Sequence, residues 1–161
     1  MRHGYFLKID GIEGESADAT HAREIEIQSW TWGVTNSTSN STFVSGEPLA
    51  KAQVQDFCFL KSVDKSSPKL LFACLKGTKL ATAALTCRQD AGKQLEYLKI
   101  RFRDVVVSSF QTSAGDPDGI PTENISLSFC RVEYDYVPIK QDGSAGAKIS
   151  EGWDILENRQ V

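Results

Sequence analysis

The sequence predicts a single all-β domain with one α-helix, arranged as a two-sheet β-sandwich or β-barrel. Most segments alternate apolar and polar residues with a period of two, which is typical of strands that bury one face. One segment of about three turns instead carries apolar residues at helical spacing, between a proline and a glycine. Several expected strands are apolar on both faces, which indicates long strands that bend between two sheets.

The chain is long enough to bury a substantial core, so residues 1–161 are predicted to form one domain with an extended loop at 36–48. We expect strands at residues 5–9, 24–34, 52–60, 80–89, 94–112, 124–137 and 148–156, and a polar tail at 157–161. Between the third and fourth strands, Ser67 is the expected N-cap of the helix, Pro68 its first residue and Gly77 its C-cap. The predicted apolar stripe of this helix is Leu70, Leu71, Cys74 and Leu75.

The strand expected at residues 24–34 changes phase in its middle. It begins with isoleucines on one face and glutamates on the other, but Trp30 and Trp32 then fall on the glutamate face. Either a bulge resets the register, or this end is covered on both faces by the same chain or by a neighbouring subunit. Aromatic residues serve both purposes, so Trp30, Trp32 and the later Trp153 are candidate packing or ring-contact residues.

Residues 124–137 change phase in the same way. The apolar positions are odd-numbered up to Phe129 and even-numbered from Val132 onward. A bulge near Cys130–Arg131, or coverage of both faces, is therefore expected here too.

The strand at residues 94–103 alternates regularly and carries a row of cations. Lys99, Arg101 and Arg103 share the face opposite to its apolar residues. We interpret this row as a solvated face, or alternatively as part of the lining of a shared cavity or lumen.

Residues 35–48 are rich in serine, threonine and asparagine and predict a long surface loop. The apolar pair Phe43–Val44 lies in the middle of this loop. A loop that only connects two strands has no need for such a pair, whereas a loop that contacts a partner does.

Composition argues against several classes of protein. The net charge of −3 is opposite to the basic surplus of nucleic-acid-binding proteins. No apolar run approaches the roughly 20 residues of a membrane-spanning helix, so we expect no membrane insertion. The first ten residues lack the apolar core of a secretory signal peptide, so we expect synthesis in the cytoplasm and export only by a dedicated machine.

Catalytic and metal-binding motifs are not found in the sequence. It lacks the HExxH, phosphate-loop, GxSxG and CxxC patterns. The two histidines, His3 and His21, have no cysteine partner nearby in sequence, and the four cysteines are interpreted as small apolar residues without disulfides. Asp116–Gly119 is interpreted as a turn and not as a calcium loop. We therefore expect no catalytic residues, no metal, no cofactor and no enzymatic activity.

Two functions remain open at this point. A subunit of a ring or tube explains the strands with two apolar faces, the polar loop with its apolar pair and the acidic surface. The alternative is a monomeric β-sandwich that binds carbohydrate or peptide on a platform of the three tryptophans.

Seven segments, in order, resemble those of the Hcp (haemolysin-coregulated protein) family, the tube protein of the bacterial type VI secretion system. The first is Phe6–Ser16 (FLKIDGIEGES), and the second runs from His21 through EIEI to Trp30, Trp32 and Gly33. The others are 64–74, 97–100, 105–109, 122–127 and 152–155.

This resemblance implies a two-sheet β-barrel with one flanking helix, and hexameric rings that stack into the inner tube of a contractile injector. It implies sheath, baseplate and spike proteins as partners, effector proteins carried in the lumen, and secretion without a signal peptide. The chain ends soon after Trp153, so we expect no appended effector domain. By analogy, the loop at 36–48 contacts the next ring, and its candidate contact residues are Asn36, Ser39, Thr42, Phe43, Val44 and Glu47.

The stacking role of this loop is testable with one substitution. We expect Phe43→Asp to impair the stacking of rings while leaving the free energy of unfolding within about 0.5 kcal/mol of the parent, because a loop residue contributes little to the core. Negative-stain electron microscopy measures the stacking, and urea unfolding measures the stability. A variant that forms tubes as readily as the parent would show that the loop is assigned wrongly.

Overall fold

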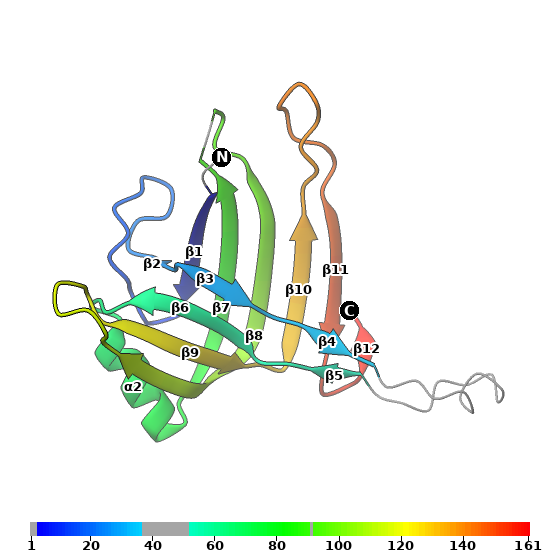
Figure 1. Ribbon diagram of the computed structural model, residues 1–161. Helices are drawn as coiled ribbons and strands as arrows, with labels where there is room; N and C mark the ends of the chain where they lie inside the picture. The colour runs from blue at the N-terminus through cyan, green and yellow to red at the C-terminus, as the bar shows by residue number, and fades with distance from the viewer. Residues whose placement is uncertain (1–2, 37–51, 91) are drawn as a thin grey trace.

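A long, bent β-sheet dominates the computed structural model, which describes residues 3–36, 52–90 and 92–161 (Figure 1). The strands are His3–Ile9 (β1), Ile25–Glu26 (β2), Ser29–Thr31 (β3), Val34–Thr35 (β4), Gln53–Val54 (β5), Phe57–Ser62 (β6), Lys79–Gln89 (β7), Glu96–Ser113 (β8), Thr122–Ser128 (β9), Arg131–Tyr136 (β10), Ile149–Asp154 (β11) and Arg159–Gln160 (β12). The helix among the described residues is Ser67–Lys76 (α2).

Two limbs of the sheet share the strand β8. The first limb has the order β12-β11-β10-β8-β7-β1-β2, and the second runs from β8 through β9 and β6 to β3. β8 is 18 residues long, and its two ends belong to different limbs. The prediction of a mostly β fold with two layers and one helix is confirmed. The pairing of the described strands does not close into a complete barrel, because β2 and β3 end the two limbs as separate strands.

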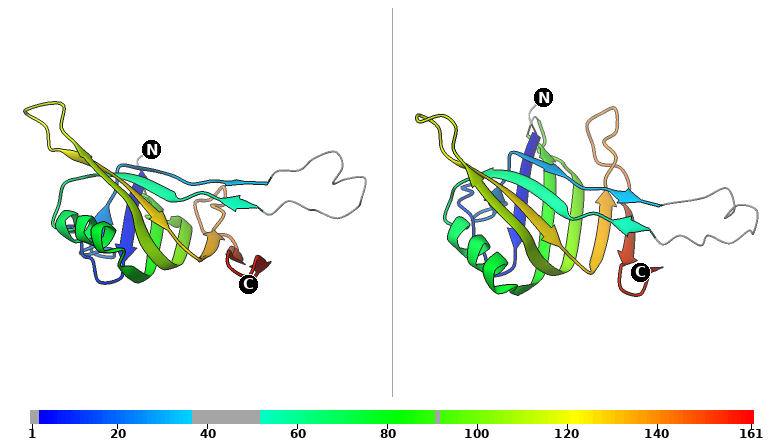
Figure 2. Two further views of the ribbon diagram at one scale, coloured as in Figure 1. Left: turned by 90° about the horizontal axis from the view of Figure 1, so that it is seen from below. Right: turned by 60° about the horizontal axis from the view of Figure 1, so that its bottom comes forward.

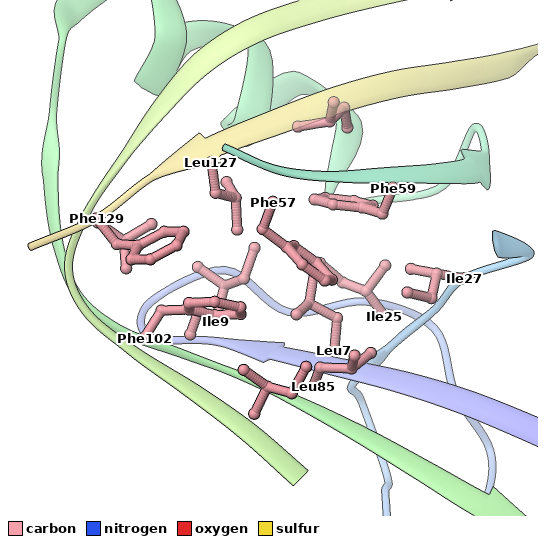
Figure 3. Close-up of a cluster of buried hydrophobic side chains, with 14 of the residues drawn as sticks. Leu7, Ile9, Ile25, Ile27, Phe57, Phe59, Leu85, Phe102, Leu127 and Phe129 are labelled. Carbon is pink, nitrogen blue, oxygen red and sulfur yellow. The ribbon is translucent and has the colours of Figure 1, made fainter. Parts of the chain in front are cut away.

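The core lies between the limbs and is rich in phenylalanine (Figure 3). The ring centroids of Phe57 and Phe102 are 5.0 Å apart, and those of Phe102 and Phe129 are 4.5 Å apart, so the side chains of the two limbs interdigitate. The free thiol of Cys87 is buried in the same core, and burial raises its pKa to about 11. Cys58, Cys74 and Cys130 are also free thiols, but they are only partly buried.

A change of strand partner explains the phase change near the tryptophans. The N–H of Ile27 donates to the Tyr5 carbonyl of β1 at 3.1 Å, whereas the N–H of Gln28 donates to the Leu60 carbonyl of β6 at 2.8 Å. Trp30 then lies directly opposite the buried Phe59. Of the two alternatives, the register reset is therefore the one observed for Trp30, and the predicted single strand is three short strands.

The phase change in residues 124–137 also arises where the chain passes from one limb of the sheet to the other. β9 pairs with β6 and β8, whereas β10 pairs with β8 and β11. The break falls at Phe129–Cys130, next to the predicted bulge, so the apolar residues on both sides of it face the same interior. The expected tail 157–161 contains β12, and the Val161 N–H donates to the Gly152 carbonyl at 3.1 Å.

The helix begins one residue earlier than predicted. Its N-cap is Ser66, and Ser67 is the first helical residue. The C-cap prediction is confirmed, because Gly77 has a φ of 62°, the left-handed conformation that glycine adopts without strain. The predicted apolar stripe is half wrong: Leu70 is buried, but Leu71 and Leu75 are exposed. Ala73 joins Leu70 in the core instead.

A buried ionic network occupies the start of α2 and explains why Ser67 is not the cap. The fully buried Lys61 ammonium lies 2.5 Å from Glu123 Oε1, 2.9 Å from Asp64 Oδ1 and 3.1 Å from Ser67 Oγ. The Ser67 hydroxyl donates to Glu123 at 2.7 Å and accepts from the Asp64 N–H at 3.0 Å. These bonds tie the helix to β6 and β9.

The segment 10–24 covers part of the outer face of the first limb. Arg88 binds Asp18 through both terminal guanidinium nitrogens, at 2.7 and 3.0 Å, and its Cζ lies 4.9 Å from the Phe6 ring centroid. The His21 ring stacks on Phe6 at 4.5 Å, with its nitrogens 2.8 Å from Glu24 and 2.6 Å from Glu96. Thr86 and Arg88, which alternate with the core residues Leu85 and Cys87 along β7, are therefore buried as well.

Gly14 allows this covering segment to approach β2. A Cβ atom at this position would lie 2.5 Å from the Glu24 carbonyl oxygen and 2.6 Å from the Ile25 Cα, both of which are backbone atoms. The N–H groups of Gly14 and Ser16 donate to the carbonyls of Arg23 and Glu24, so the backbone directly before β2 is paired with this covering segment.

The buried ionic network gives a stability prediction. Lys61→Met should lower the free energy of unfolding by about 3–5 kcal/mol, because it leaves the Glu123 charge buried without its partner. The double variant Lys61→Met/Glu123→Leu should recover most of this loss, since two apolar side chains need no partner. Urea unfolding of both variants measures the effect. If the double variant were no more stable than Lys61→Met, the unpaired Glu123 charge would not be the cause of the lower free energy of unfolding, and the prediction would be wrong.

The Asp18–Arg88 pair predicts a pH dependence. Hydrogen bonds from the Arg88 guanidinium hold the pKa of the Asp18 carboxyl well below its usual range. Because the folded pKa is depressed, its stabilising contribution is present above the unfolded pKa of about 3.9 and is lost as the pH falls below that value. Asp18→Asn should therefore be less stable than the parent at neutral pH, and the difference should shrink as the pH falls from about 4 to about 2.

Urea unfolding at fixed protein concentration measures this difference at each pH. Glu13→Gln is the matched control, because Glu13 meets the exposed side chains of Arg23 and Lys65 only at 4.0 and 3.7 Å. A constant difference between Asp18→Asn and the parent at all pH values would contradict the prediction.

Candidate assembly surfaces

The structure separates the three tryptophans into two environments. Trp30 turns toward the core and stacks on Phe57, with the ring centroids 5.9 Å apart. Trp32 packs at 6.2 Å from Phe102, and its Nε1–H donates to the Gln55 carbonyl at 2.9 Å. All three indoles remain partly exposed. The structure thus does not place them on one common platform.

Trp32 and Trp153 instead line one groove beside the last strands. Trp153 on β11 lies opposite Val132 on β10, on the face that continues from the core. The groove has a volume of about 390 Å³ and is lined by Trp32, Val132, Tyr134, Glu151, Trp153 and Gln160, together with Gly152. We call these residues the wing groove, since β10, β11 and β12 extend past the core at one side of the molecule (Figure 1). Its lining is apolar except for Glu151 and Gln160.

The wing continues the inner face of the sheet, and several of its large side chains remain exposed. Tyr136 pairs across the sheet with the buried Leu98 on one side and with Ile149 on the other. Tyr134, Tyr136 and Ile149 are all exposed. This part of the inner face therefore presents large apolar side chains to solvent.

The cations of β8 lie on the opposite, outer face and are largely paired with β10. Arg101 Nη2 lies 2.8 Å from Glu133 Oε2, and Arg101 Nη1 lies 2.9 Å from Asp135 Oδ2. Arg103 approaches Glu133 at 3.7 Å, and Lys99 is exposed opposite the buried Asp135. Strand pairing thus converts the predicted row of cations into a mixed ionic face, and this face could not be predicted without knowing which strand pairs with β8.

The residues proposed for ring stacking fall mostly outside the described ranges. Asn36 is exposed directly after β4, whereas Ser39, Thr42, Phe43, Val44 and Glu47 lie outside the described residues. The strands β4 and β5 that lead into and out of this segment pair through Val34 and Val54 and extend away from the main sheet (Figure 2).

Sequence reasoning missed the buried charged residues, although their positions carried a signal. Lys61 is in phase with Phe57 and Phe59, and Glu123 is in phase with Ile125 and Leu127. A charge in phase with core residues, on each of two strands, is a usable indication of a buried ion pair.

The described residues carry neither a metal centre nor a membrane helix. Within 3–36, 52–90 and 92–161, no group of three or more His, Cys, Asp or Glu side chains is placed to hold a metal ion. No helix in these ranges has the length and apolar character needed to cross a membrane.

Comparisons with known proteins give one consistent answer. The family model described as "Type VI secretion system effector, Hcp" matches residues 6–136. Protein hcp1 of Pseudomonas aeruginosa is 41% identical over 158 residues, which is 97% of this chain and 97% of that protein.

Solved structures agree with this match. A type six secretion system protein superposes with a TM-score of 0.93 at 31% identity, over 99% of this chain and 100% of its own. Hcp1 from Salmonella typhimurium gives a TM-score of 0.80 at 32% identity, again over 99% of this chain and 100% of its own. A type VI secretion system effector from Yersinia pestis gives 0.73 at 37% identity, over 93% and 98% of the two chains. This chain therefore belongs to the Hcp family of type VI secretion system proteins.

Proposed function

We propose that this chain is a structural subunit of the type VI secretion tube, which forms hexameric rings that stack. The observation that carries the proposal is the apolar inner face of the wing, where Tyr134, Tyr136 and Ile149 continue the core surface into solvent. Monomeric soluble proteins rarely leave large contiguous apolar patches exposed. Membership of the Hcp family supports a second copy of the chain as the partner that covers this face.

The proposed work is mechanical and not catalytic. In a closed ring each contact is heterologous, so one patch of a subunit must fit a different patch on its neighbour. Each contact must be weak enough for rings to assemble and separate, while the sum of the contacts around the ring and between rings holds the tube during ejection.

Several further roles belong to the same proposal. The subunit is made in the cytoplasm and leaves the cell through the type VI machine. Its partners are other rings, the sheath, the baseplate and spike, and effector proteins in the lumen. The mixed ionic face with Lys99, Arg101 and Arg103 is a candidate for the lumen or the solvent side, because ionic side chains suit a wet surface.

The alternative is a monomer that binds carbohydrate or peptide. The wing groove is the observation that supports this alternative. Trp32 and Trp153 lie beside an apolar groove of about 390 Å³, as in many ligand sites. Trp30 instead stacks on Phe57 in the core, so only two of the three tryptophans remain for a ligand to stack on.

Native mass spectrometry of the purified chain at micromolar concentration separates these functions. The tube proposal predicts a species of about six times the chain mass of 17.7 kDa, and negative-stain images of rings with a central channel. A single species at the chain mass at all concentrations, with no rings in the images, would overturn the tube proposal and leave the binding module.

A further inference from the structure

The outer side of α2 carries a second exposed apolar surface. Pro68, Leu71, Phe72 and Leu75 follow one another at positions i, i+3, i+4 and i+7, which places them on one side of the helix. Leu71 is 38% exposed, Phe72 53% and Leu75 69%. We call these four residues the helix ridge.

The helix ridge is not needed to attach α2 to its own chain. Leu70 and Ala73 already pack into the core from the other side of the helix, and the Lys61 network binds its first turn. A solvent-facing helix side normally carries polar residues. An apolar stripe at the spacing of i, i+3, i+4 and i+7 on that side is the pattern of a helix that fits into an apolar groove.

Basic residues border the helix ridge on one side. Helical spacing places Lys69 and Lys76 on the same edge of it, and the Lys76 ammonium lies 6.0 Å from the Phe72 ring centroid. No acidic residue occurs within α2. The ridge is therefore a convex apolar surface with a positive border.

The wing groove has the complementary character. It is concave and apolar, and its one charged residue is Glu151. The Glu151 carboxylate accepts a hydrogen bond from Gln160, and within the described ranges it forms no ion pair with Lys, Arg or His. Opposite charge across an interface favours one register and one partner over others.

The two surfaces cannot meet within one molecule. α2 lies at one end of the fold and β10, β11 and β12 lie at the other, in all three views (Figures 1 and 2). Complementary patches on opposite sides of one chain make a head-to-tail contact between copies, which closes a ring or extends a filament.

We infer that the helix ridge of one copy packs into the wing groove of the next copy, with Lys76 or Lys69 facing Glu151. This inference rests on the proposed ring and names the pair of surfaces that forms the contact within it. Phe72 and Leu75 are the anchors on the ridge, and Trp32, Tyr134 and Trp153 form the apolar pocket that receives them.

Two single variants test this contact, and each of them disrupts only one of the two surfaces. Leu75→Asp removes the ridge and Tyr134→Asp removes the groove, so each protein alone should lose the ring and sediment as a monomer. The dissociation constant should rise by at least about 30-fold, as for the loss of one strong interface anchor. Mixed in equal amounts, the two variants should form a dimer, because each still carries one intact surface.

Ile120→Asp is the matched control, since Ile120 is also 69% exposed but lies in the turn between β8 and β9. It should form rings like the parent. Circular dichroism and thermal unfolding check that every variant is folded.

A charge exchange provides a second measurement that does not alter the apolar core of the contact. Lys76→Glu and Glu151→Lys should each weaken ring formation, and the double variant should restore it. Analytical ultracentrifugation at low and high salt measures the effect, because the added repulsion is screened by salt.

The outcomes distinguish this inference from the proposed function. A parent that forms rings, with Leu75→Asp and Tyr134→Asp forming them equally well, overturns the ridge-and-groove contact alone. A mixture of the two variants that remains monomeric also overturns it. A parent that is monomeric under all conditions overturns both, and binding of a carbohydrate or peptide to the groove of that monomer would then identify the other occupant.

Discussion

The bending of β8 is the constraint on which the rest of the fold depends. Its 18 residues pair with β7 and β10 at one end and with β9 at the other, so one continuous strand fixes the position of both limbs. Phe102 and Val107 enter the core from the two parts of this strand. The phenylalanine cluster then holds the limbs against each other, because large apolar side chains from both are buried together.

Two of the irregularities in the sequence pattern follow from chain segments that cross from one limb to the other. The crossing at Ile27–Gln28 turns Trp30 inward, and the crossing at Phe129–Cys130 turns Val132 inward. Buried ion pairs connect the segments that lie outside the apolar core. The Lys61–Glu123 pair lies at the start of α2, and the Arg88–Asp18 pair lies under the segment 10–24. Apolar residues are left uncovered on the outside of α2 and on the wing.

Most elements were predictable from local pattern, and the errors came from contacts between distant segments. The alternation of residues 94–103 and the capping of the helix by Gly77 are local and were assigned correctly. The burial of Thr86 and Arg88 depends on a covering segment about 70 residues earlier in the chain, so the alternation along β7 alone does not reveal it. The partial exposure of the predicted helix stripe depends on which side of α2 faces the core. Helical spacing shows which residues share a side of the helix, but it does not show which side packs against the sheet. Pairing of Arg101 with Glu133 similarly depends on which strand lies beside β8.

The position of α2 relative to the wing has a geometric consequence. α2 and the wing are attached to the same sheet. The orientation of the helix ridge relative to the wing groove is therefore set by the fold of one chain. In a head-to-tail assembly this orientation sets the rotation between successive copies, and six copies close when each turns by about 60°. The number of subunits around the channel, and so its diameter, would then be encoded in the curvature of one chain and not in any separate scaffold.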